Sequence, residues 1–272
     1  MNKPNFLYHY TNIDTLALIL EHKTFRLSSL MNMDDKQECM SRDNINIGKY
    51  IFTSCWTPNR DESIPMWYMY TSKSDGVRIG MRSNCFKEYP ITKTEIKSLY
   101  PGMNVSGQEN SFLIFFPVEE FMKQDFCCFP FIQEQLLIPI TYTEDESLLN
   151  PTVIEREGSK FHVAFDKIGR FKNKSWEFQQ EWRYKMSVMP FSIEEAMSKP
   201  DAIGQELIKR ILLDNYKIPD YIDLDLSDNG LKSLEITTSP FMSVGNKDIV
   251  NLLVNVYCPN AKLIDSALEG LV

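Results

Sequence analysis

The most constraining feature of this sequence is its opening block, which predicts a short strand followed at once by a helix. Residues 6–10 read Phe-Leu-Tyr-His-Tyr, a run rich in the aromatic side chains that favour strands. Thr11 and Asn12 are residue types that cap helices, and apolar side chains then recur at helical spacing between residues 13 and 20. We therefore expect a first strand that ends in His9, an aromatic ring and a hydroxyl group.

The rest of the chain alternates short strand patterns with short helical patterns, which predicts an α+β fold with mostly antiparallel sheets. Asp228-Asn229-Gly230 has the composition of a hairpin turn. We expect one domain over residues 1–272, with an irregular, aromatic-rich insertion at 85–135. Strands are expected at 25–28, 50–56, 76–81, 137–142, 182–188, 221–226, 234–237 and 262–264, and helices at 65–70, 159–172, 192–199, 201–210 and 249–256.

Charge and cysteine usage narrow the class of protein. The 272 residues include 29 Lys and Arg and 37 Asp and Glu, and the net charge of −8 argues against a protein built on non-specific phosphate contacts. The six cysteines form no C-x-x-C pair, which argues against a zinc ribbon and favours a reducing compartment. The sequence has no signal-peptide pattern and no apolar run of membrane-spanning length. We therefore expect a cytoplasmic protein without a membrane partner.

Common catalytic and metal-binding motifs do not occur in the sequence. It lacks a nucleophile elbow, a Walker loop and a Gly-rich dinucleotide fingerprint. With only three histidines, a multi-histidine metal site is not expected. Asp34, Asp35 and Glu38 form an acidic cluster without the spacing of a calcium loop. We expect this cluster to bind an arginine or backbone amides, and we predict no metal.

The expected helix at 65–70 carries aromatic side chains that allow two interpretations. Met66, Trp67 and Tyr70 share one helix face, and the commoner role of such a face is core packing. The second interpretation is an aromatic platform, because a nicotinamide ring stacks well on Tyr or Trp.

A second unusual block surrounds Glu181, at the start of the expected strand 182–188. On a strand, Gln179, Glu181 and Arg183 would point to one face. A carboxylate held there can bind a ribose hydroxyl and stabilise positive charge at the anomeric carbon as a glycosidic bond breaks. The alternatives are a surface ion pair between Glu181 and Arg183, which would contribute little, and a glycosidase that uses Glu177 as a second carboxylate.

These blocks resemble known families. Residues 7–11, the short helix after them and Phe25-Arg26-Leu27-Ser28 resemble the start of ADP-ribosyltransferases of the His-Tyr-Glu type, closest to their DNA-targeting toxin branch. The whole chain more closely resembles a bacterial family of unknown function. The motifs shared with that family are Tyr8-His9-Tyr10-Thr11, Asp35 with Glu38, Cys55-Trp56, Pro65-Met66-Trp67, Gly76-Val77-Arg78-Ile79 and Glu181-Trp182-Arg183.

The resemblance to the transferases implies an ADP-ribosyltransferase-like split sheet and a role for each of these residues. His9 would act in catalysis and hydrogen-bond the ribose of NAD, and Glu181 would be the catalytic carboxylate. Tyr70, or alternatively Tyr68 or Trp67, would stack on the nicotinamide ring. Tyr10 stands where many relatives have a glycine whose backbone contacts the nicotinamide amide. The other residues implied in cofactor binding are Thr11, Ser28, Trp67, Gln179 and Arg183.

We therefore expect an NAD-dependent ADP-ribosyltransferase that modifies a protein or nucleic-acid acceptor, in the role of a toxin or an anti-phage effector. The alternatives are a non-catalytic module that binds a nucleotide or a protein on the same fold, and an NAD glycohydrolase. The basic residues near the expected site are Arg170, Lys172, Lys174 and Arg183, which would contact cofactor phosphates or an acceptor strand, or form a solvated helix end.

Overall fold

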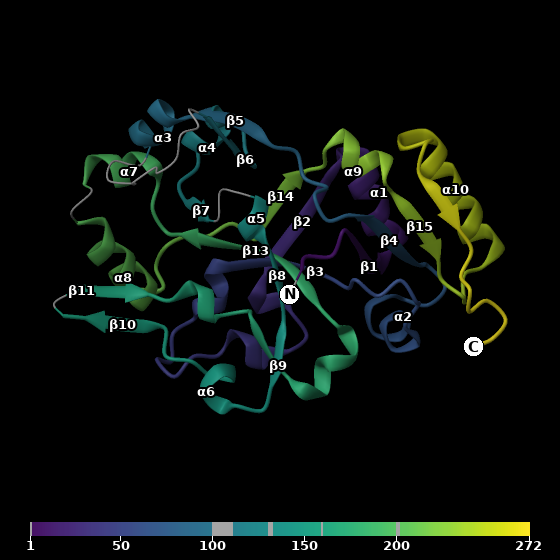
Figure 1. The fold of residues 1–272 in the computed structure, drawn as a ribbon, viewed down its shortest axis with the longest axis horizontal. Coiled ribbons are helices and arrows are strands. Elements are labelled where there is room, and N and C mark those ends of the chain that lie inside the picture. Colours follow the sequence, from purple (N-terminus) through teal and green to yellow (C-terminus); the bar gives the residue numbers. More distant parts are fainter. Residues whose placement is uncertain (1, 100–110, 130–132, 159, 200–201) are drawn as a thin grey trace.

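The chain has an α+β fold built around two main sheets (Figure 1). The computed structural model describes residues 2–99, 111–129, 133–158, 160–199 and 202–272. The four-stranded sheet has the order β1-β4-β15-β16, and the six-stranded sheet has the order β14-β2-β3-β13-β7, with β8 also paired to β13. The bounds of these strands are Phe6–Asn12 (β1), Thr24–Ser29 (β2), Ile51–Trp56 (β3), Gly76–Arg82 (β4), Cys127–Phe129 (β7), Leu137–Pro139 (β8), Trp182–Met189 (β13), Tyr221–Asp225 (β14), Glu235–Thr238 (β15) and Lys262–Ile264 (β16).

Three two-stranded sheets lie outside these two: β5 with β6, β10 with β11, and β9 with β12. Among the strand pairs described, only β15 with β16 and β9 with β12 run parallel. The bounds of the outer strands are Tyr89–Thr92 (β5), Ser111–Ile114 (β6), Thr141–Thr143 (β9), Ile154–Glu157 (β10), Lys160–Val163 (β11) and Phe171–Asn173 (β12).

Short helices flank the sheets. The longest described, α10 (Val244–Tyr257), lies beside the four-stranded sheet at the right of Figure 1 and is capped by the Ser243 side chain. No described helix is both long and apolar enough to cross a membrane. The other helices are Ile13–His22 (α1), Ile64–Tyr70 (α2), Lys93–Leu99 (α3), Val118–Met122 (α4), Gln133–Leu136 (α5), Glu146–Leu149 (α6), Ile193–Ser198 (α7), Ile203–Leu213 (α8) and Asp228–Lys232 (α9).

The opening block folds as its sequence predicts. Strand β1 leads directly into α1, whose first turn follows Asn12 in an extended conformation and whose last turn ends at Lys23 in the left-handed region (φ 54°). Leu16 and Leu20 bury the apolar side of α1 in the core. The strands expected at 25–28, 50–56, 76–81, 182–188 and 221–226 are also present, within one residue at each end.

The two main sheets meet where β1 crosses the end of β3. The backbone N–H of Tyr8 donates to Thr57, and the N–H of Thr57 donates back to Tyr8, both at 2.8 Å. Backbone groups alternate in direction along a strand, so the N–H and C=O of Tyr10 point to the same side as those of Tyr8, away from β4. Beyond Thr57 this side of β1 has no partner strand in the described chain. The junction therefore leaves one edge of the first strand open.

The structure corrects the helix expected at 159–172. Residue 159 lies outside the described residues, and the rest forms β11, a 3₁₀ turn at Phe165–Lys167 and β12. Strand β11 pairs with β10, and β12 pairs with β9. Tertiary strand pairing has therefore overridden a local pattern that resembled a helix.

The structure also corrects the expected hairpin at Asp228-Asn229-Gly230. These residues begin helix α9, which the Ser227 hydroxyl caps by accepting from the N–H of Gly230. Strands β14 and β15 on either side belong to different sheets. Gly230 is required by packing, because a Cβ there would lie 2.5 Å from the carbonyl oxygen of Cys85.

The region expected as an insertion at 85–135 is only partly peripheral. Strands β5 and β6 form a separate sheet, whereas β7 joins the six-stranded sheet beside β13 and buries Cys127 and Cys128. Residues 100–110 and 130–132 lie outside the described residues. The strand expected at 137–142 is divided into β8 and β9, which pair with different strands.

Candidate functional site

Two adjoining cavities lie at the junction of the two sheets. The smaller has a volume of about 80 Å³ and the larger a volume of about 480 Å³. Five residues line both cavities, and we call the two together the hollow: His9, Met33, Asp34, Cys55 and Tyr70. The smaller cavity is also lined by Tyr8, Tyr10, Trp56, Met66, Lys172, Gln179, Glu181 and Arg183.

His9 projects from β1 into both cavities and has a defined tautomer. Its Nδ1 lies 2.7 Å from the carbonyl oxygen of Cys55, an acceptor, so Nδ1 carries the hydrogen. Burial lowers the pKa of His9, which keeps the imidazole neutral at physiological pH. The rings of Phe25 and Trp56 pack against it, with centroids 5.0 and 5.3 Å away. The Nε2 atom is therefore a hydrogen-bond acceptor available to a ligand.

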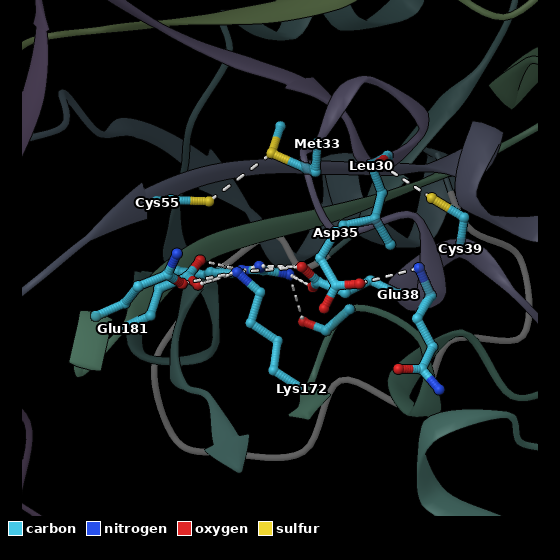
Figure 2. Close-up of polar contacts among 12 residues, drawn as sticks. Leu30, Met33, Asp35, Glu38, Cys39, Cys55, Lys172 and Glu181 are labelled. Carbon is cyan, nitrogen blue, oxygen red and sulfur yellow. Dashed lines mark hydrogen bonds and ion pairs between the residues drawn. The ribbon is translucent and has the colours of Figure 1, made fainter. Parts of the chain in front are cut away.

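Glu181 belongs to a buried cluster of four charged side chains. The Lys172 Nζ lies 2.8 Å from Glu181 Oε2 and 3.2 Å from Glu38 Oε1, and Arg183 bonds both carboxylates. Figure 2 shows Glu181 and Glu38 at the two ends of the resulting line of contacts, with Lys172 beneath it. Arg183 is 0% exposed, and the two positive and two negative charges balance.

The charges in this cluster stabilise one another. Burial alone would raise the pKa of Glu181, but Arg183 and Lys172 outweigh burial and lower it to about 2. Burial alone would lower the pKa of Arg183, but Glu181 and Glu38 hold it well above its usual value. Glu181 therefore stays ionised at neutral pH. The expected alternative of a surface ion pair between Glu181 and Arg183 is wrong, because both side chains are buried.

Gln179 and Tyr70 connect to this cluster through Lys172. The Lys172 Nζ donates to Gln179 Oε1 at 2.8 Å, and Gln179 Nε2 donates to the Tyr70 hydroxyl. Gln179 and Glu181 do not lie on one strand as expected. Gln179 ends a 3₁₀ turn, and Gln180 between them has a left-handed backbone (φ 46°). Their side chains meet because Lys172 bonds both.

The structure brings most of the predicted site residues to the hollow. His9, Tyr10, Tyr70, Gln179, Glu181 and Arg183 line the smaller cavity, and Ser28 lines the larger one. Thr11 is buried and lines neither cavity, so the structure does not bring it beside the other predicted residues.

Trp67 also lines neither cavity, so the structure does not bring it beside the other predicted cofactor-binding residues. The side chain is fully buried, and its Nε1 donates to Glu62 at 2.9 Å. Its ring packs edge-on against Tyr10, with the centroids 4.9 Å apart. Trp67 therefore has the core-packing role that its helix face also allowed.

Sequence reasoning missed the central place of Lys172 and the full role of Glu38. The acidic cluster was expected to bind an arginine, and Glu38 does bind Arg183, while Asp35 accepts from the N–H of Gln37. Lys172 was weighed as the end of a solvated helix, but it lies on β12 and is buried. A lysine between two half-buried neighbours gives no local signal of a partner nine residues away.

Within the described part of the chain, no group of three or more His, Cys, Asp and Glu side chains is arranged to hold a metal ion. Comparisons of the chain with protein-family models, with curated proteins and with solved structures gave no match.

Proposed function

We propose that this protein is an NAD-dependent ADP-ribosyltransferase that transfers ADP-ribose to a macromolecular acceptor. The observation that carries the proposal is the convergence of His9, Tyr70 and Glu181 on one cavity. These residues come from β1, from the end of α2 and from the residue before β13, so only the fold brings them together.

The chemistry of the three groups fits a nicotinamide riboside. The neutral His9 offers Nε2 to a ribose hydroxyl, and the Tyr70 ring offers a face to the nicotinamide. The ionised Glu181 stabilises the positive charge that develops at C1′. The bond from C1′ to the nicotinamide nitrogen breaks, and its electron pair leaves with nicotinamide. The acceptor then forms the new bond to C1′ and loses a proton.

The open edge of β1 supports the same placement. The N–H and C=O of Tyr10 point away from β4, and Tyr10 lines the smaller cavity. A carboxamide such as that of nicotinamide has one donor group and one acceptor oxygen, so it complements a free strand edge. The Tyr10 side chain leaves this edge clear, because its hydroxyl accepts from the N–H of Ser63 and its ring packs on Trp67. The larger cavity, lined by Ser28 and Arg26, gives the rest of the dinucleotide room.

A specific observation favours a second candidate, a nucleotide-binding module without turnover. A carboxylate offers about four acceptor positions. Those of Glu181 already accept from Arg183 Nε, from Arg183 Nη2 at 3.2 Å and from Lys172 at 2.8 Å. A carboxylate with three of about four positions taken can serve the fold alone. The two candidates differ in whether NAD is consumed.

Incubation of the purified protein with NAD labelled in the adenylate phosphate separates these candidates. Label on a macromolecule from a cell extract supports the transferase. Free labelled ADP-ribose in place of that product identifies an NAD glycohydrolase and contradicts the transferase. Tight binding of NAD without consumption supports the module. A Glu181→Gln variant whose melting curve shows that it is folded, run in parallel, should lose the labelled product.

A further inference from the structure

The hydrogen bonds around Tyr70 have a fixed direction, which begins at Lys172. An ammonium group has three donors and no acceptor. The three oxygens near Lys172 Nζ belong to Gln179 (2.8 Å), Glu181 (2.8 Å) and Glu38 (3.2 Å). Gln179 must therefore present its oxygen to Lys172, since its NH₂ group would face a donor. This contact settles an amide orientation that heavy-atom positions alone leave open.

The orientation of Gln179 determines what the Tyr70 hydroxyl can do. The NH₂ group of Gln179 faces Tyr70, so the phenol oxygen is the acceptor in this contact. Burial is the largest cause that raises the pKa of Tyr70, so the phenol keeps its hydrogen at neutral pH. Among the described residues, the Tyr70 hydroxyl has no other hydrogen-bond partner. Its hydrogen is therefore unused, and Tyr70 lines both cavities.

We propose that Tyr70 donates a hydrogen bond to an oxygen of the bound ligand, and that Lys172 and Gln179 are positioning residues that keep Tyr70 in this donor role. The ligand's identity as NAD rests on the proposed function, but the direction of the hydrogen bonds does not. This role differs from stacking, which needs only the ring of Tyr70.

The neighbouring groups narrow the oxygen to a hydroxyl. His9 Nε2 and the Glu181 carboxylate, which line the same cavity, are both acceptors. A sugar hydroxyl can accept from Tyr70 and donate its single hydrogen to one of these acceptors. The cavity therefore suits a ribose hydroxyl that uses the Tyr70 donor together with His9 or Glu181.

Removal of the Tyr70 hydroxyl separates the donor role from stacking. Tyr70→Phe keeps the ring and removes the hydrogen. Isothermal titration calorimetry with NAD should show affinity reduced about tenfold, in line with the loss of one buried hydrogen bond. The matched control is Tyr68→Phe on the same helix, since Tyr68 is exposed and lines neither cavity. Equal NAD affinity of Tyr70→Phe and the wild type would contradict the proposal.

A double-mutant cycle tests the positioning role. Gln179→Glu replaces the NH₂ group that faces Tyr70 with a carboxylate oxygen, which is ionised at pH 8 beside Lys172. The variant has no donor for Tyr70, so the phenol would turn its hydrogen toward position 179. We expect Gln179→Glu to weaken NAD binding as much as Tyr70→Phe, and the double variant to be no weaker than either. If the double variant binds NAD about a hundredfold more weakly than the wild type, the two substitutions act independently. That result would contradict the positioning role of Gln179.

The direction of the hydrogen bond between Gln179 and Tyr70 can also be tested without a ligand, so this test stands even if the proposed function fails. If the wild type does not bind NAD, the NAD proposal falls. A neutron structure of the unliganded protein then shows the hydrogens directly. A Tyr70 hydrogen on the cavity side, with the Gln179 NH₂ group facing Tyr70, supports the inferred direction. A Tyr70 hydrogen on the line to Gln179 overturns it.

Discussion

Two arginines in this protein each bind two carboxylates, one in the interior and one at the surface. Arg183 holds Glu38 and Glu181 with all three side chains at 3% exposure or less. Arg210 on α8 holds Glu195 and Glu206, and both of these glutamates are 40% exposed. The ion pairs are chemically alike, but water screens only the second set. Burial therefore turns an ordinary surface arrangement into a cluster whose members depend on one another.

The contrast also appears between two buried lysines. Burial alone would lower the pKa of Lys172, but Glu181 and Glu38 raise it above the usual value. Lys185 has only the carbonyl oxygens of Phe165 and Asp166 as hydrogen-bond partners in the described chain, and burial lowers its pKa to about 7. Carboxylate partners thus decide whether a buried lysine stays charged.

The largest expected effect is the decrease in the free energy of unfolding when Arg183 is replaced. Arg183→Met leaves Glu38 and Glu181 in the interior with Lys172 alone, and an uncompensated buried charge costs about 3–5 kcal/mol. Urea denaturation should show this decrease in the free energy of unfolding. A decrease below about 1 kcal/mol would show that the interior cluster behaves like a surface one.

The next effect concerns the proposed catalytic role of Glu181. Glu181→Gln removes the negative charge beside C1′ and should reduce NAD turnover about 100- to 1,000-fold, the usual loss for one electrostatic stabiliser. Nicotinamide release measures this rate, and the melting temperature confirms that the variant is folded. Turnover within a factor of two of the wild type would leave Glu181 a purely structural residue.

The pH dependence of stability tests the two lysines. The folded pKa of Lys185, about 7, lies below the unfolded value near 10.5, so the unfolded chain binds more protons between these values. The contribution of Lys185 therefore makes the protein more stable as pH rises from about 7 to 9. Lys185→Met should remove this slope in urea denaturation series. A slope unchanged by the substitution would show that Lys185 is charged in the folded protein.

The smallest effect is expected at the surface. Arg210→Met breaks contacts with Glu195 and Glu206 that water already screens, and should cost about 1 kcal/mol. High salt should reduce this cost further, whereas the cost of Arg183→Met should change little. If Arg210→Met and Arg183→Met lowered the free energy of unfolding equally, the interior and surface clusters would not differ in strength.

Local sequence signals predicted the parts of the fold that local physics controls. The run from β1 into α1 follows from residue type and periodicity. His9 was singled out near the end of the first strand pattern, and Glu181 at the start of a late one. Trp67 shows the limit of this reasoning. A ring at helical spacing suits a core, its commoner role, and also a binding platform, and only the partners Tyr10 and Glu62 decide between them.

Long-range pairing accounts for what the sequence did not reveal. The sequence predicts a helix at 159–172, but β11 and β12 are fixed by partners in β10 and β9. This error hid Lys172, whose importance depends on Glu181 and Glu38 rather than on its neighbours in the chain. Buried ion clusters of this kind join distant segments, so the sequence of any one segment does not predict them.

In the proposed function, His9, Tyr70 and Glu181 form one site for a nicotinamide riboside. A crystal structure with a non-hydrolysable NAD analogue tests this claim most directly. We predict the nicotinamide ring beside Tyr70 and the strand edge at Tyr10, with C1′ next to Glu181 and a ribose hydroxyl at His9. An analogue bound elsewhere on the protein, with this hollow unchanged, would contradict the account.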